Sequence, residues 1–408
     1  MTSGLEFRVT PATPVPAAER AKLIENPGFG KLFTDHMVTI EWSDGKGWHN
    51  AEVRARAPFS LDPASAVLHY AQEIFEGMKA YRGRGGEITM FRPEENARRF
   101  NESADRMAMP RIPEELFVEA VEKLVAADRD WIPDGEGSLY LRPFMFADEV
   151  FLGVKPAAHY IFCVIASPVG PYFKGGGKPV TIWVSDNYTR AAPGGTGAAK
   201  CGGNYAGSLI AQAEAIREGC DQVVFLDAAE RRWVEELGGM NVFFVMDDGS
   251  LVTPPLGTIL PGITRASLIE LARGDGLKVE EKPYSFDEWK VDAESGRLRE
   301  VFACGTAAVV AGIGTVRFRG GEFTIGDGTT TGPVTQKLRE ALGHSSAQNW
   351  SMTTRAEEKP TPWAEKDMLI AMQEADGVRM SVPLSGVVRE LIKDFKVRMN
   401  YPTPKAPK

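Results

Sequence analysis

Strand-like and helix-like stretches alternate through the second half of this 408-residue chain. Short runs of apolar and β-branched residues predict strands at 180–184, 222–226, 242–246 and 300–303. Apolar residues at helical spacing predict helices at 206–218, 264–273 and 334–342. This alternation argues against a helical bundle or a β-sandwich and indicates an α+β or α/β fold.

The first half has the elements of a second, smaller domain. Strands are predicted at 36–42, 88–91, 138–143 and 160–166, with helices at 64–75, from Arg92-Pro93 onward, and two near 113–128. The segment 170–178 contains three consecutive glycines and predicts a linker. The chain therefore divides into an N-terminal arm (1–30), a small α/β domain (31–170), a linker (171–180), a large domain (181–350) and a C-terminal extension (351–408).

The C-terminal extension differs in character from the rest of the chain. Its ends are rich in proline, and two short helices are predicted at 364–376 and 385–399. The second helix would carry an apolar stripe that includes Val388, Leu391, Ile392 and Phe395. Such a stripe needs a surface to cover.

Composition restricts the class of protein. The formal net charge of −8 argues against nucleic acid or an anionic membrane as a partner. The four cysteines are widely spaced without a C-x-x-C pair, so a disulfide framework is not expected and a reducing compartment fits. No metal site is expected. No secretory signal and no apolar run of about 20 residues is present. A cytoplasmic protein is therefore expected.

Lys200 is the first candidate for chemistry. It lies in Ala199-Lys200-Cys201-Gly202-Gly203, after a glycine-rich run, among small uncharged residues. Loss of solvation favours the neutral, nucleophilic form of an amine, and such lysines form Schiff bases, above all with pyridoxal phosphate. The alternative is a surface lysine beside a flexible turn. A nucleotide loop is excluded, because Ala199 and Cys201 replace the glycine and the hydroxyl residue which that motif needs.

A lysine that holds pyridoxal phosphate needs partners for the ring nitrogen and the phosphate. Glu235 and Glu236 put carboxylates just before an apolar strand, although adjacent glutamates are ordinarily solvated. The turn 260–265 enters a helix, and the free N–H groups of a helix start bind phosphate. The small-residue turn 304–308 also suits an anion. Each feature alone is commonplace.

Taken together, the order and spacing of Lys200, Glu236 and the two turns resemble those of the fold-type IV pyridoxal phosphate enzymes. Within that class, the segments 72–81, 140–143 and 200–205 look like those of the branched-chain amino acid aminotransferases. The resemblance covers about residues 25 to 345. It implies two domains with the active site at their interface, and a homodimer.

The resemblance also implies roles for individual residues. Lys200 would form the Schiff base and shuttle the proton, Glu236 would face the ring nitrogen, and Tyr205 the ring hydroxyl. The expected phosphate ligands are Arg99, Ile263, Thr264 and Thr306. The expected substrate contacts are Tyr70, Phe75, Tyr140, Arg142, Ala307 and Ala308. Without the family resemblance, Arg99 would be interpreted as a solvated cation on a helix face. The aromatic residues would be interpreted as core residues, namely Tyr70, Phe75 and Tyr140.

The implied reaction is reversible amino transfer from L-leucine, L-isoleucine or L-valine to 2-oxoglutarate, giving L-glutamate. The mammalian members carry a C-x-x-C pair where this chain has Ala308 and Ala311, so redox control by that pair is not expected. The extension 351–408 has no counterpart in the resemblance. The rival functions are a D-amino acid transaminase, an aminodeoxychorismate lyase and a non-catalytic binding protein of the same fold.

Overall fold

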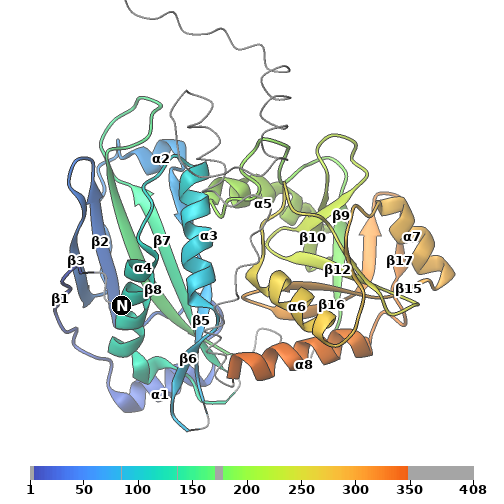
Figure 1. Ribbon diagram of the computed structural model, residues 1–408, viewed down its shortest axis with the longest axis horizontal. Helices are drawn as coiled ribbons and strands as arrows, with labels where there is room; N and C mark the ends of the chain where they lie inside the picture. The colour runs from blue at the N-terminus through green and yellow to red at the C-terminus, as the bar shows by residue number, and fades with distance from the viewer. Residues whose placement is uncertain (1–3, 84, 136, 171–177, 348–408) are drawn as a thin grey trace, which may run out of the picture. The chain divides into compact units, whose positions relative to one another are not determined.

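The computed structural model describes residues 4–83, 85–135, 137–170 and 178–347. In these residues the chain builds two large sheets, each with helices packed on it (Figure 1). The first sheet ends with Val169 and the second begins with Val180, on either side of the predicted linker. The glycine run 175–177 and the predicted helices of the extension lie outside the described residues.

The first sheet has the strand order β1-β3-β2-β8-β7-β5-β6, with β4 paired to β7. Its pairs are antiparallel except for β1 with β3. The strands are β1 (Arg8–Val9), β2 (His36–Ser43), β3 (Gly47–Ala55), β4 (Glu73–Phe75), β5 (Met78–Arg82), β6 (Ile88–Met90), β7 (Ser138–Ala147) and β8 (His159–Val169).

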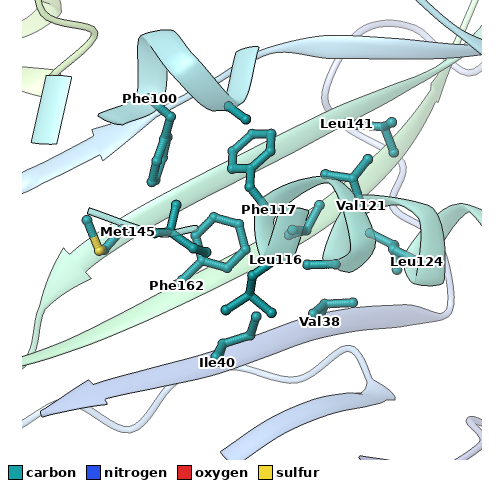
Figure 2. Packing of buried hydrophobic residues seen from close by; sticks show 14 of the residues in the cluster. Val38, Ile40, Phe100, Leu116, Phe117, Val121, Leu124, Leu141, Met145 and Phe162 are labelled. Atoms are coloured by element: carbon teal, nitrogen blue, oxygen red, sulfur yellow. The ribbon is translucent and has the colours of Figure 1, made fainter. Parts of the chain in front are cut away.

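Helices α3 (Pro93–Arg106) and α4 (Glu114–Ala127) supply the apolar cover of this sheet. In α4 the buried residues recur every three or four positions, which places them on one face. This face packs against buried side chains of β2, β7 and β8 (Figure 2). The labelled members of the cluster are Val38, Ile40, Phe100, Leu116, Phe117, Val121, Leu124, Leu141, Met145 and Phe162.

The second sheet has the order β11-β10-β9-β16-β15-β12-β13-β14, with β17 paired to β16. Strand β9 runs parallel to β10 and β16, and β13 runs parallel to β14; the other pairs are antiparallel. The strands are β9 (Val180–Ser185), β10 (Gln222–Leu226), β11 (Val234–Leu237), β12 (Asn241–Met246), β13 (Leu251–Thr253), β14 (Val279–Glu281), β15 (Leu298–Gly305), β16 (Val309–Phe318) and β17 (Gly321–Thr324).

Both faces of the second sheet are buried, which explains why its strands are nearly continuous apolar runs. In β12, Phe243 packs with α6 (Ile263–Gly274) and α8 (Pro333–Ala347), while Phe244 packs on the other face against Trp289 of α7 (Phe286–Ser295). Helix α5 (Gly202–Arg217) covers β9 and β10. None of the described helices combines the length and apolar character needed to cross a membrane.

The helix predicted at 64–75 is wrong over its second half. Helix α2 covers only Ala66–Tyr70, because Ala71 adopts a left-handed conformation with φ 47° and ends it. The chain then becomes β4, which pairs with β7. Strand pairing overrides the helical spacing here: Leu68 of the predicted apolar stripe is exposed, whereas Ile74 is fully buried in the sheet.

Two further expectations differ from the structure. Residues 1–30 contain β1 and a helix, α1 (Ala17–Glu25), and side chains such as Phe7 and Ile24 pack against the first core. The segment is therefore partly packed and is not only an arm. The two helices predicted near 113–128 are one helix, α4, followed by a 3₁₀ turn at Arg129–Trp131.

We expect Phe117→Ala to lower the free energy of unfolding by about 3–5 kcal/mol. Phe117 is fully buried, and its ring centroid lies 5.3 Å from that of Phe100 and 5.7 Å from that of Phe162. Urea-induced unfolding measures the change. The neighbouring, only partly buried Val118 is the control, and Val118→Ala should cost about 1 kcal/mol. Equal losses in the two variants would contradict this account of the core.

Candidate active site

The backbone around Lys200 is fastened to elements of the first half of the chain. The Phe75 amide of β4 donates a hydrogen bond to the Lys200 carbonyl (2.9 Å), and the Lys200 amide donates to Ser103 Oγ of α3 (2.9 Å). Next along the chain, the Gly202 amide donates to the Glu73 carboxylate. Helix α5 begins at Gly202, four residues earlier than predicted, and the backbone of Lys200 is held on both its amide and its carbonyl side.

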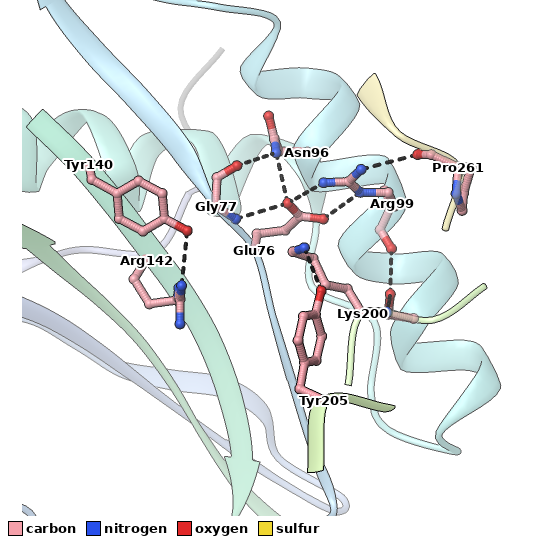
Figure 3. A network of polar contacts seen from close by, with 10 residues as sticks. Glu76, Gly77, Asn96, Arg99, Tyr140, Arg142, Lys200, Tyr205 and Pro261 are labelled. Atoms are coloured by element: carbon pink, nitrogen blue, oxygen red, sulfur yellow. Dashed lines mark hydrogen bonds and ion pairs between the residues drawn. The ribbon is translucent and has the colours of Figure 1, made fainter. Parts of the chain in front are cut away.

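The amine of Lys200 points at aromatic groups. Its Nζ donates a hydrogen bond to the Tyr205 hydroxyl (3.0 Å), as Figure 3 shows. The same atom lies 5.0 Å from the centre of the Phe75 ring. Within the described residues no carboxylate lies at ion-pair distance from Nζ. Lys200 is partly buried and borders a cavity, so the structure does not place it on an open surface turn.

The cavity beside Lys200 has a volume of about 180 Å³. It lies between the two sheets, with walls from both. Apart from Tyr70 and Ala308, all the residues predicted for the site border it: Phe75, Arg99, Tyr140, Arg142, Lys200, Tyr205, Glu236, Ile263, Thr264, Thr306 and Ala307.

Glu236 is a fully buried carboxylate at the wall of this cavity. Its Oε1 forms an ion pair with Arg190 Nη1 (2.7 Å) and accepts a hydrogen bond from the Leu260 amide (2.9 Å), and its Oε2 accepts one from Asn241 Nδ2 (3.2 Å). Burial raises the pKa of Glu236 to about 7, against the opposing effect of the Arg190 guanidinium. A carboxylate held in this way can keep a cationic ring N–H charged.

Glu235 is directed elsewhere, because successive side chains of a strand point to opposite faces. Its carboxylate accepts a hydrogen bond from the Thr258 hydroxyl, and it does not border the cavity. The structure therefore distinguishes two adjacent glutamates that, without the family resemblance, the sequence leaves equivalent.

Arg99 is held by a buried acid. Its Nε and Nη2 each donate to the carboxylate of Glu76 at 2.7 Å, and its Nη1 donates to the Pro261 carbonyl (3.1 Å) (Figure 3). Burial alone would raise the pKa of Glu76, but the guanidinium of Arg99 reverses the effect and holds that pKa below its ordinary value. Three of the five N–H donors of Arg99 are used, which leaves two for an anion.

The start of helix α6 offers backbone donors. The amides of Ile263 and Thr264 donate no hydrogen bond within the described part of the chain, as is usual in the first turn of a helix. Gly262 precedes them, and a Cβ there would lie 2.0 Å from Asn241 Oδ1. A glycine at this position therefore lets Asn241 approach and support Glu236.

The turn between β15 and β16 offers a second set of donors. The amides of Thr306, Ala307 and Ala308 make no hydrogen bond to the residues that the structure describes. Thr306 and Ala307 border the cavity, and the next residue, Ala308, is buried and is not part of the lining. Free amides in a concave turn favour an anion.

An aromatic wall with one cation closes another side of the cavity. The guanidinium carbon of Arg142 lies 4.7 Å from the centre of the Phe75 ring and 5.3 Å from that of Tyr140, and Nη2 donates to the Tyr140 hydroxyl (2.9 Å). Arg142 has no ion pair among the described residues, and its buried Nε has no hydrogen-bond partner. A structural salt bridge is therefore not what holds it. A Cβ on Gly77 would lie 2.3 Å from the Tyr140 hydroxyl, so this packing needs glycine.

Tyr70 lies outside the cavity. It is partly exposed on α2, and its hydroxyl donates to the Leu152 carbonyl. In a single chain it does not reach the residues around Lys200.

Sequence reasoning missed several residues that the structure brings to the site. Arg190 and Glu76 are distant partners of Glu236 and Arg99, and Phe29 of the N-terminal segment borders the cavity with its ring centroid 5.2 Å from that of Tyr140. The requirement that a buried charge have a counter-charge predicts that such partners exist. Only the fold identifies which arginine or glutamate supplies them.

The groups around the cavity fit pyridoxal phosphate. Lys200 offers an amine for the aldehyde, Glu236 a buried carboxylate for the ring nitrogen, and Tyr205 a hydroxyl for the ring oxygen. The free amides at the start of α6, with Thr306 and Arg99, suit the phosphate dianion.

Comparison with known proteins agrees with this set of groups. Residues 73–316 match the family model described as amino-transferase class IV. Over 334 residues the chain is 58% identical to the "probable branched-chain-amino-acid aminotransferase" of Streptomyces coelicolor, covering 81% of this chain and 92% of that protein. The chain belongs to the branched-chain amino acid aminotransferases of class IV. This family membership confirms the resemblance seen in the sequence.

Solved structures of aminotransferases show the same fold. The branched-chain amino acid aminotransferase of Escherichia coli matches with a TM-score of 0.62 and 29% identity, covering 76% of this chain and 97% of that one. The "T.th." branched-chain amino acid aminotransferase, solved in complex with N-(5'-phosphopyridoxyl)-L-glutamate, matches with a TM-score of 0.61 and 30% identity, covering 76% and 94%. The chain thus has the two-domain, fold-type IV architecture, and its cavity lies between the domains.

We expect Arg190→Met to lower the free energy of unfolding, measured without added cofactor, by about 3–5 kcal/mol at pH values well above 7, because the ionised Glu236 loses its counter-charge. The pKa of Glu236, already raised to about 7, would rise further. The folded variant would then hold a proton that the unfolded chain releases, so its deficit relative to the wild type should widen as the pH rises above about 7.

Urea-induced unfolding at several pH values tests this expectation. In the double variant Arg190→Met/Glu236→Gln the neutral amide needs no cation, so most of the lost stability should return. A deficit that does not depend on pH, or that persists unchanged in the double variant, would show that Arg190 acts through packing rather than charge.

Proposed function

We propose that this aminotransferase moves the amino group of L-leucine, L-isoleucine or L-valine to 2-oxoglutarate, giving the branched-chain 2-oxo acid and L-glutamate. The observation that carries the proposal is one cavity in which the amine of Lys200 faces an aromatic wall holding the single cation Arg142. Amino transfer needs the amine, and a pocket for both leucine and glutamate needs the wall and the cation together.

The cofactor we propose is pyridoxal 5'-phosphate. Lys200 would hold its aldehyde, Glu236 its ring nitrogen, Tyr205 its ring hydroxyl, and Arg99 with the amides of Ile263 and Thr264 and with Thr306 its phosphate. When bound, it supplies an electron sink for the pair left behind when the Cα–H bond of the substrate breaks. The "T.th." relative was solved with a phosphopyridoxyl compound, which supports this assignment.

Lys200 has a second role in the proposal, as the base that takes the Cα proton from the amino acid. The Tyr205 hydroxyl, 3.0 Å from Nζ, orients the amine for that transfer. The Lys200 backbone is anchored on both sides, so the side chain alone moves between its roles. The amino acid that donates the amino group and the 2-oxo acid that accepts it use the same site in turn, which predicts ping-pong kinetics.

The substrate side chain would lie against Phe75 and Tyr140. These rings accept an aliphatic side chain, but they would reject an unpaired carboxylate, whose burial costs several kcal/mol. Arg142 resolves the conflict. Its charge is spread over two aromatic faces when leucine is bound, and it can pair with the distal carboxylate of glutamate or 2-oxoglutarate. The α-carboxylate of either substrate would meet the amides of the 306–308 turn, including those of Ala307 and Ala308.

We further propose a cytoplasmic homodimer. All four cysteines are free and buried, as suits a reducing compartment. Exposed apolar side chains near Tyr70, namely Leu68, Leu152 and Val154, form a surface that a second copy could cover. A substrate contact by Tyr70 would then depend on that assembly.

The rival functions lack support in the site. A D-amino acid transaminase or an aminodeoxychorismate lyase does not account for the pairing of Tyr140 and Arg142 on one face of β7. A non-catalytic binding protein does not account for the meeting of Lys200, Glu236 and Arg99 in one cavity.

A panel of amino donors tests the proposal. The wild-type enzyme with 2-oxoglutarate should form glutamate from leucine, isoleucine and valine, and not from D-alanine. We expect Lys200→Ala to lower the rate by at least about 10³-fold, because the covalent attachment and the base are both lost. The exposed Lys278 provides a control, since Lys278→Ala should retain full activity. Normal turnover by the Lys200 variant, or preferential use of D-alanine, would refute the assignment.

Arg142→Met should separate the two substrate classes. We expect kcat/KM of the half-reactions with glutamate and 2-oxoglutarate to fall about 100-fold. This fall corresponds to the loss of a charge-assisted pair of about 3 kcal/mol. The half-reaction with leucine should change far less, since methionine keeps the pocket apolar. Single-turnover measurements of each half-reaction give the comparison. Equal losses for leucine and glutamate would exclude a selective role for Arg142.

A further inference from the structure

Lys79 is a buried cation without a carboxylate partner among the described residues. It lies on β5 with 9% of its surface exposed, and its Nζ donates a hydrogen bond to the Ala307 carbonyl (3.0 Å). Burial lowers the pKa of Lys79 to about 8, so the ammonium keeps its charge near neutral pH. Buried ammonium groups are usually paired with an acid, because the unpaired charge is costly. An uncompensated one indicates that an anion binds nearby.

The carbonyl that Lys79 holds belongs to the turn between β15 and β16. That turn is under backbone strain, because the β-branched Val309 adopts a φ of 63°. It also carries the three amides, from Thr306 to Ala308, that donate no hydrogen bond to the described residues. A strained turn with free donors needs an external contact to keep one conformation.

The hydrogen bond from Lys79 to the Ala307 carbonyl acts directly on one of the free amides of the turn. The Ala307 carbonyl and the Ala308 amide are the two ends of one planar peptide group and point in opposite directions. Holding the carbonyl therefore fixes the direction of the amide N–H. A cation on the carbonyl oxygen also polarises the group and makes the N–H a stronger donor.

Lys79 contacts the 306–308 turn from outside the cavity that contains Lys200. It borders a smaller cavity of about 50 Å³, and it does not border the cavity that contains Lys200. The two cavities are neighbours, because Gly77, Ile263, Thr264, Gly305 and Thr306 border both of them. Lys79 can thus influence an anion in the main cavity through the turn without touching it.

We propose that Lys79 is a positioning residue for the substrate α-carboxylate: it holds the Ala307 peptide so that the 306–308 turn presents its amides to that group. The proposal rests on the function proposed above, and it assigns to Lys79 the selection of amino acids over simple amines. Because the lysine comes from the first sheet and the turn from the second, the contact also sets how the two walls of the site meet.

Two ligands that share the leucine side chain test the assignment. 4-Methylvalerate has the carboxylate without the amine, and 3-methylbutylamine has the amine without the carboxylate. Dissociation constants are measured by calorimetry on the enzyme loaded with pyridoxal phosphate. We expect Lys79→Met to raise the dissociation constant of 4-methylvalerate by about 10- to 100-fold, as for a lost charge-assisted contact. The dissociation constant of 3-methylbutylamine should change by less than about 3-fold. The KM for leucine should rise while kcat stays within a few-fold.

Two further variants keep the test decisive if Lys79→Met folds poorly. Lys79→Gln keeps a hydrogen-bond donor without the charge and should lose less 4-methylvalerate affinity than Lys79→Met. Lys79→Arg keeps both and should lose least. Equal weakening of the two ligands, or unchanged 4-methylvalerate affinity in an active Lys79→Met enzyme, would overturn the proposal. Failure of the wild type to use leucine would instead overturn the proposed function.

Discussion

The hydrogen bond from the Phe75 amide to the Lys200 carbonyl joins Lys200 to the first sheet, and the arrangement of the site depends on it. Strand β4 is only three residues long, yet it pairs with β7 on one side and bridges to Cys201 on the other. The lysine therefore sits between two sheets whose residues are far apart in sequence. A lysine in a glycine-rich loop would otherwise sample many positions, at a cost in entropy for each encounter with substrate.

Charge is distributed in the site according to a simple rule. Arg99 with Glu76 and Arg190 with Glu236 form buried pairs in which each charge has its partner, and these pairs organise the proposed cofactor region. Two other cations, Lys79 and Arg142, have no carboxylate partner in the described chain. In the proposal both serve the substrate, Lys79 through the 306–308 turn and Arg142 by direct contact. A cation buried without a partner costs free energy, and an anion that arrives during the reaction would offset that cost.

The two sheets contribute differently to this arrangement. The first supplies the aromatic wall, Arg142 and the lysine behind the turn, which we assign to the substrate. The second supplies Glu236 and the start of α6, which we assign to the cofactor, and the 306–308 turn, whose amides we assign mainly to the substrate α-carboxylate. A site built between two rigid sheets holds its groups more firmly than one built on loops of a single domain.

Much of this arrangement could be predicted from the sequence. The periodicity of the strands and helices indicates an α/β architecture, and the spacing of Lys200, Glu236 and the two turns indicates the family, which the comparisons confirm. These features are local, so the pattern of neighbouring residues specifies them. The helix predicted at 64–75 is the exception. Its apolar spacing is helical, but the pairing of β4 with β7 makes the second half of the segment a strand.

The partners of the site residues were decided by the tertiary structure alone. Nothing in the sequence selects Arg190 among its 47 basic residues as the partner of Glu236, or directs Lys79 to a carbonyl that is 228 residues away. The direction of Glu236 rather than Glu235 into the cavity depends on the register of β11 in its sheet. Long-range contacts of this kind follow from how the sheets pack, because burial forces each charge to meet whichever group the fold brings within reach.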